Sequence, residues 1–164
     1  MSIRRAAATI GAISLGLVAL TACDKPTPLA TVTVGSRTVT AQATDKCYNH
    51  GKKLPQAIFL ACLQNATPKH HITVAVGDTV RIGVDPKLAK KGWLIANGTT
   101  LVTNELLKDK TYWSLDSATL FTQQDPQSGQ TVTAKQVTLN IVESGDTTGN
   151  DSFGIWQIKL IRGQ

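Results

Sequence analysis

The sequence is poor in the residues on which most enzyme chemistry depends. It contains three histidines, three cysteines and two glutamates, and its only methionine is Met1. No G-x-S-x-G segment is present, so the nucleophile turn of many serine hydrolases is missing. A blue-copper centre needs two histidines, a free cysteine and usually a methionine, and the chain has no methionine after residue 1. We therefore predict a protein that is not an enzyme and that carries no cofactor and no metal.

Long runs of one charge are also absent. The 17 Lys and Arg residues exceed the 11 Asp and Glu residues by six, and two of the basic residues, Arg4 and Arg5, lie in a segment that we expect to be removed, which leaves +4. The lysines form no run of five and do not alternate with aromatic residues, so nucleic acid is not an expected partner. An anionic lipid surface or an acidic wall polymer fits the sign of the charge, although a scattered excess of this size is usually a solubility feature.

The N-terminal segment resembles a bacterial lipoprotein signal. Residues 6–19 carry no charge, and the small residues of Leu20-Thr21-Ala22 precede Cys23. The uncharged stretch is shorter than the roughly 20 residues that a bilayer core requires, which argues against an uncleaved membrane span. We predict removal of residues 1–22 and attachment of diacylglycerol to the Cys23 thiol, with a possible third acyl chain on the new amino group.

The mature chain is then expected to consist of an anchored tether and one domain. Residues 23–30 contain two prolines and no periodicity, as in a flexible linker. Residues 31–164 are enough for one domain but not for two. Two or more buried acyl chains would hold this domain on the extracytoplasmic face of the cell membrane.

The two remaining cysteines, Cys47 and Cys62, are expected to form a disulfide, because an exported protein folds in an oxidising compartment. A zinc site is the alternative. Cys47 and His50 have suitable spacing, but Cys62 would then need a partner such as His70 or His71, and no local pattern supplies it.

Alternation of apolar and polar residues predicts an all-β fold. Strands are expected at 31–34, 39–43, 72–76, 80–84, 93–97, 112–113, 119–122, 135–143 and 156–160. A short helix is expected over 86–91, with Asp85 as its cap and Gly92 after its end. Residues 56–63 fit a short helix that begins at Pro55 or a buried strand, and we favour the helical turn. The spacing of the strands favours a two-sheet sandwich of the immunoglobulin-like type.

Several segments together resemble a family of uncharacterised actinobacterial lipoproteins. They are the lipobox, the cysteine pair, V-x-V-G-D-T-V-x-I-x-V at 74–84, V-D-P-x-x-x-x-x-G-W at 84–93 and the closing G-I-W-Q-I at 154–158. The resemblance covers most of the mature chain. It implies a secreted, membrane-tethered β-sandwich and assigns no catalytic residue.

Residues for a binding surface can be proposed from exposure and charge. Trp156 is expected in the core because it alternates with core positions, and Trp93 because it follows the short helix and should pack under it. The predicted surface comprises Lys87, Lys90, Lys91, Tyr112 and Trp113.

The expected function is a non-enzymatic interaction or accessory module of the cell envelope, with an envelope protein or a wall polymer as partner. A ligand-binding or protease-inhibitor-like domain is the first alternative, using the loops around Lys87 to Trp93 and Thr99 to Trp113. It shares only the general layout of inhibitory immunoglobulin-like domains, because their N-P-T-T-G loop is absent. A metal-handling lipoprotein that uses His50, His70 and His71 is the second alternative.

Overall fold

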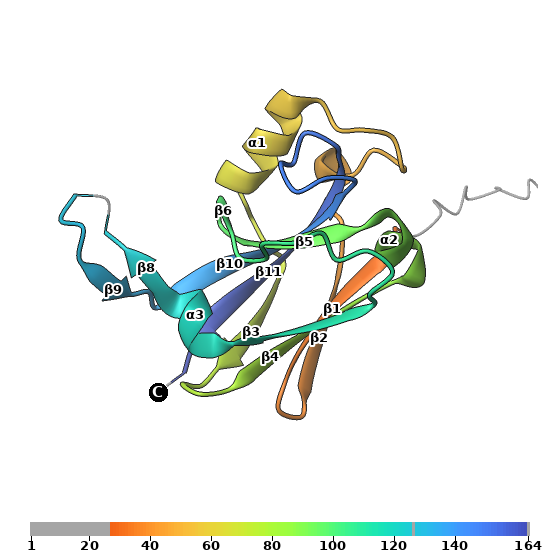
Figure 1. Ribbon diagram of the computed structural model, residues 1–164. Coiled ribbons are helices and arrows are strands. Elements are labelled where there is room, and N and C mark those ends of the chain that lie inside the picture. Colours follow the sequence, from red (N-terminus) through yellow and green to blue (C-terminus); the bar gives the residue numbers. More distant parts are fainter. Residues whose placement is uncertain (1–26, 126, 164) are drawn as a thin grey trace, which may run out of the picture.

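The computed structural model describes residues 27–125 and 127–163. The predicted signal segment and the lipidation site at Cys23 lie outside the described residues. Within them the chain forms two packed β-sheets with short helices, which confirms the predicted all-β sandwich (Figure 1).

The first sheet has four antiparallel strands. In sheet order they are β2 (Arg37–Gln42), β1 (Leu29–Val34), β4 (Thr79–Val84) and β7 (Tyr112–Asp116). Gly35 joins β1 to β2 with a φ of +58°, as a two-residue hairpin turn that begins with glycine requires. β1 begins at Leu29, so Leu29 and Ala30 belong to the sheet and not to the predicted tether of residues 23–30. They are fixed by pairing with β2 and, for Ala30, with β4.

The second sheet has five strands. In sheet order they are β3 (His70–Val74), β11 (Ser152–Arg162), β10 (Gln136–Ser144), β5 (Trp93–Asn97) and β6 (Thr100–Leu101). β3 runs parallel to β11, and the other pairs are antiparallel. The chain crosses between the sheets from β3 to β4, where Asp78 accepts a hydrogen bond from the Ala75 amide at 2.8 Å. Because β3 and β4 belong to different sheets, this connection is a corner and not a hairpin.

The main core lies between the two sheets. Trp93 and Trp156 are fully buried in it, as predicted. Each indole N–H donates to a backbone carbonyl at 2.7 Å, Trp93 to Lys110 and Trp156 to Pro28, so neither polar group is left unpaired. The core also receives alternate residues of the long strands, among them Leu139, Ile141, Ile158 and Leu160.

Three α-helices and one 3-10 helix lie between the strands: η1 (Asp45–Cys47), α1 (Gln56–Gln64), α2 (Pro86–Lys91) and α3 (Ser117–Phe121). α2 is the predicted helix, and the Asp85 carboxylate accepts from the Lys87 amide at 2.8 Å. Residues 56–63 are helical. The strand expected at 119–122 is wrong, because Asp116 caps a helix there by accepting from the Ala118 amide at 2.7 Å. A small hairpin, β8 (Thr122–Gln124) with β9 (Thr131–Thr133), then projects from the body (Figure 1).

A third layer covers one end of the five-stranded sheet on its outer face. The segment from η1 to α1 contributes Cys47, Leu54, Phe59, Cys62 and Leu63 to a second apolar cluster. These side chains pack on three residues of the sheet, Leu94, Val142 and Ile155. Part of the sheet is therefore buried on both faces, which a simple two-layer sandwich does not provide.

Candidate binding cleft

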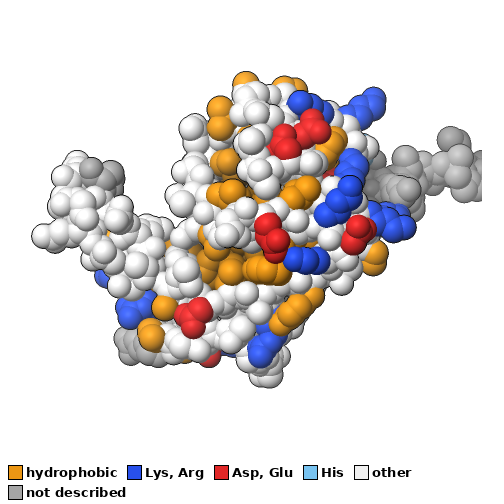
Figure 2. Space-filling model, in the orientation of Figure 1, with side chains coloured by type: hydrophobic (Ala, Val, Ile, Leu, Met, Phe, Trp, Pro, Cys, Tyr) orange, Lys and Arg blue, Asp and Glu red, His pale blue; other side chains and the backbone are white. Residues whose placement is uncertain are grey.

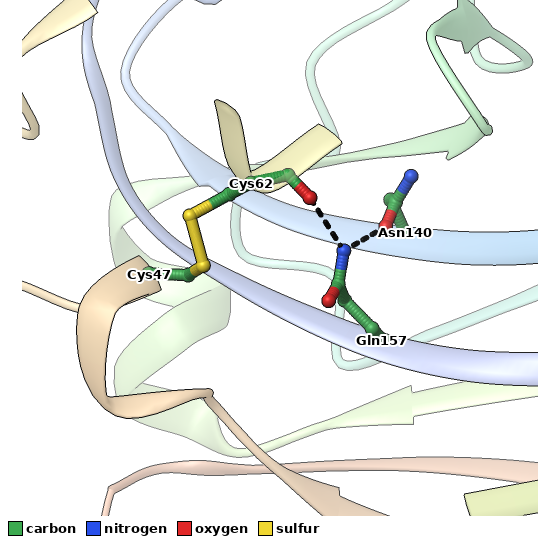
Figure 3. Close-up of a disulfide and its surroundings, with 4 residues drawn as sticks. All are labelled: Cys47, Cys62, Asn140 and Gln157. Atoms are coloured by element: carbon green, nitrogen blue, oxygen red, sulfur yellow. Dashed lines mark hydrogen bonds between the residues drawn. A yellow bond between two sulfur atoms is a disulfide. The ribbon is translucent and has the colours of Figure 1, made fainter. Parts of the chain in front are cut away.

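A disulfide holds the third layer together, as predicted. Cys47 of η1 and Cys62 of α1 are bonded, with their Cα atoms 5.9 Å apart (Figure 3). The bridge closes the irregular segment of residues 47–62 into a loop. Because both sulfur atoms are in the bond, the predicted alternative of a zinc site at these cysteines does not apply.

A buried glutamine ties this layer to the sheet. The Gln157 amide nitrogen on β11 donates to the Cys62 carbonyl and to the Asn140 side-chain oxygen on β10, each at 2.9 Å (Figure 3). Asn140 in turn donates to the Gly98 carbonyl at 2.7 Å. Gln157 is 5% exposed, so an unpaired amide at this position would be costly. The C-terminal turn of α1 is thereby fixed against the two central strands.

A cleft of about 890 Å³ opens beside the disulfide. Strand β2, η1, the end of α1, the segment leading into β3, and Gln157 of β11 supply its walls. Its polar lining includes Thr40, Gln42, Asn65, Thr67 and Gln157. The cleft combines backbone and side-chain hydrogen-bonding groups with apolar surface, as small-ligand sites commonly do.

The charged residues of the cleft are basic. Lys46 and Lys69 line it and are exposed, and neither forms an ion pair with a described carboxylate. Among the described side chains of the lining there is no aspartate or glutamate and no tryptophan, tyrosine or phenylalanine. His70 supplies the one aromatic ring among the described lining residues, so the cleft offers mainly hydrogen bonds and positive charge and little surface for stacking. None of its residues belongs to the surface predicted from the sequence.

The predicted lysines do not act as one group. Lys87 and Lys90 are exposed on α2, whereas Lys91 is half-buried. The Lys91 ammonium donates to the Gly51 carbonyl at 2.7 Å and lies 3.8 Å from the centre of the Phe153 ring. Lys91 thus connects α2 to the loop at Gly51 and to the start of β11, and these contacts account for its position without a ligand.

Lys91 also approaches a buried carboxylate. Its ammonium lies 3.9 Å from Glu143 Oε1, while Glu143 Oε2 is buried without a hydrogen-bond partner in the described part of the chain. Burial raises the pKa of the Glu143 carboxyl above its ordinary value, and Lys91 acts in the opposite direction. Burial, and to a lesser degree Glu143, also raises the pKa of Tyr48. The sequence pattern does not predict this cluster, because Glu143 lies at the end of the predicted strand 135–143, where alternation identifies only the apolar face.

The predicted aromatic pair lies on β7, an edge strand of the first sheet. Tyr112 is 52% exposed, whereas Trp113 is half-buried and packs against the main core. The Lys110 ammonium lies 5.0 Å from the centre of the Trp113 ring. Figure 2 shows hydrophobic side chains in a band across one face of the molecule, with basic and acidic side chains interspersed around it.

The structure does not assemble the histidines of the metal-handling hypothesis. The His50 ring lies 5.3 Å from that of Tyr48, whereas His70 and His71 begin β3. Within residues 27–125 and 127–163, no three His, Cys, Asp or Glu side chains are placed to hold a metal ion together. No helix in the same residues has the length and hydropathy to span a membrane.

Comparisons with protein-family models, curated proteins and solved structures find no match to this chain. The described residues form a two-sheet β-sandwich with a third layer that is held by a disulfide. The resemblance to actinobacterial lipoproteins stays a prediction.

Proposed function

We propose that the protein is a lipid-anchored, non-enzymatic interaction module of the bacterial cell envelope, held on the extracytoplasmic face of the cell membrane. The observation that carries the proposal is the sequence Leu20-Thr21-Ala22-Cys23 after an uncharged segment and two arginines. The resemblance to a family of secreted lipoproteins supports the same assignment.

The start of the domain agrees with a short anchor. β1 begins at Leu29, six residues after Cys23. Six residues span at most about 20 Å, so a lipid on Cys23 would keep the domain close to the bilayer surface. A domain so restricted meets partners in the envelope rather than free in solution.

The disulfide supports export. A Cys47–Cys62 bridge that closes a surface layer is typical of domains that fold outside a reducing cytosol. The cleft beside it supports a binding role, because it is the place where described polar groups from several elements converge.

Metabolic labelling tests the anchor. Cells that express the full chain are grown with an alkyne analogue of palmitate, and the label on the protein is read after coupling to a fluorophore. We expect a labelled wild-type chain, no label on Cys23→Ala, and retained label on the matched control Cys47→Ala/Cys62→Ala. Globomycin should cause the unprocessed precursor to accumulate. Label on Cys23→Ala, or processing that is unchanged by globomycin, would overturn the proposal.

A further inference from the structure

The cleft beside the disulfide has the composition of a site for a particular class of ligand. It is lined by hydroxyl and amide side chains, by two lysines and by apolar surface. We infer that it binds a segment of an anionic, hydroxyl-rich polymer, such as a polysaccharide or polyol chain that carries carboxylate or phosphate. The inference deepens the proposed function and depends on it only for the place where the polymer is met.

The lysines indicate the charge of the ligand. Lys46 comes from η1 and Lys69 from the segment before β3, so two separate elements bring an ammonium group to the same cleft. Neither is paired with a described carboxylate, unlike Lys53, Lys91 and Lys110. An ammonium group can donate charge-assisted hydrogen bonds to a carboxylate or a phosphate of a ligand.

The neutral lining indicates hydroxyl groups. Thr40 and Thr67 each provide a hydroxyl that both donates and accepts, and Gln42 and Asn65 each provide an amide with both functions. Ligand hydroxyl groups need partners of both kinds, whereas a simple polyanion needs only donors. His70 is the one aromatic side chain among the described lining residues, so hydrogen bonds must supply most of the discrimination that stacking provides in other sites.

The size and rigidity of the cleft suit a polymer segment. A volume of about 890 Å³ lies near the upper end of the range for small-molecule sites. The disulfide and the Gln157 bonds to Cys62 and Asn140 fix the wall formed by α1 before any ligand arrives. A preformed wall avoids part of the ordering cost of binding.

Four soluble probes test separately whether binding requires negative charge and hydroxyl groups on the ligand. The full-length chain, purified in a nonionic detergent and immobilised on a biosensor, is titrated with polygalacturonate and poly(glycerol phosphate) fragments, with dextran fragments and with poly-L-glutamate. We expect binding to at least one of the first two that is at least tenfold tighter than to dextran or poly-L-glutamate, and that weakens as salt is added. Preference between the first two identifies carboxylate or phosphate as the ligand charge.

Paired variants locate the site. Lys46→Gln/Lys69→Gln should weaken binding at least fivefold, whereas Lys87→Gln/Lys90→Gln removes the same charge from α2 and should change it less than twofold. In α1, Ala61 lines the cleft and Ala57 does not, although both are exposed. Ala61→Phe should therefore block binding, and Ala57→Phe should not.

Three results would overturn the inference. They are the absence of binding to both hydroxyl-rich polyanions, equal binding of poly-L-glutamate, and equal effects of the two members of either variant pair. Because binding is measured without a membrane, its failure is distinguishable from a failure of the palmitate labelling. A chain that is labelled with palmitate but binds none of the probes would support the proposed anchor and refute the proposed ligand of the cleft.

Discussion

Replacement of both bridged cysteines, in Cys47→Ala/Cys62→Ala, tests how the third layer is stabilised. The two residues are 15 positions apart, and the chain-entropy relation gives a loss of about 3 kcal/mol at 25 °C for a loop of this length. For a domain of this size that loss corresponds to a fall in Tm of roughly 10 °C. Both cysteines are buried in the second apolar cluster, so lost packing adds to the effect rather than offsetting it.

The folded state should nevertheless keep its shape. Gln157 donates to the backbone carbonyl of Cys62, and this bond survives the substitution because it uses no sulfur. Most of the decrease in the free energy of unfolding should therefore arise in the unfolded chain, which becomes less constrained. A less compact unfolded state exposes more surface, so the urea m-value should increase.

Urea unfolding, followed by tryptophan fluorescence, provides the assay. Three samples are compared, namely the oxidised wild type, the wild type reduced with dithiothreitol, and the alanine variant. The reduced wild type should be less stable than the oxidised wild type by about 3 kcal/mol, and the alanine variant should lose at least as much because it also loses the packing of both cysteine side chains. A loss below about 1 kcal/mol with an unchanged m-value would refute the reasoning, since it would mean that the bridge does not restrict the unfolded chain.

Three further predictions concern buried polar groups, each measured by urea unfolding. Thr44 has a buried hydroxyl without a partner in the described part of the chain, so Thr44→Val should be neutral or stabilising by up to about 1 kcal/mol. In the matched variant Thr103→Val, the Ile95 amide loses the hydroxyl that accepts its hydrogen bond at 3.1 Å, so the free energy of unfolding should fall by about 1–3 kcal/mol. Equal effects of the two valine substitutions would contradict this reasoning. Gln157→Leu should cost about 1–3 kcal/mol because two acceptors lose their donor, and an unchanged midpoint would show that the bonds are dispensable. The pKa of the Glu143 carboxyl is raised in the folded state, so the folded chain binds this proton more tightly than the unfolded chain does. The stability of the wild type relative to Glu143→Gln should therefore be highest below the ordinary carboxyl pKa and should fall as the pH rises through the raised pKa. A stability difference that is constant from pH 4 to 7 would exclude the effect.

The sandwich could be predicted because its signals are local. Alternation with a period of two identified the inward faces of the long strands, and the D-P start with a following glycine identified α2. The same reasoning was wrong at residues 119–122. Thr119 and Thr122 favour a strand by composition, but the Asp116 carboxylate caps a helix that begins at Ser117. The capping aspartate was present in the sequence and was the stronger signal.

The cleft could not be predicted in the same way, because its walls depend on contacts between distant residues. Gln157 and Cys62 are 95 positions apart, and no local pattern relates them. Alternation assigned Gln157 to the polar face of its strand, which is correct for direction but not for exposure. The exposure of a strand's outward face depends on the segment that packs against it, and for β11 that segment is α1.

One signal of the covering layer was nevertheless present in the strands. On the outward face of β11, Ile155 is buried under α1, Gln157 is bonded to Cys62, and Lys159 is half-exposed. An apolar residue on the supposedly polar face marks a strand that is buried on both sides at that level. The change from apolar to charged along three successive outward positions therefore marks where the third layer ends. Gln157 lies at that boundary and lines the cleft. A buried polar residue between an apolar and a charged outward neighbour therefore indicates the edge of a covering layer, where a binding site can form.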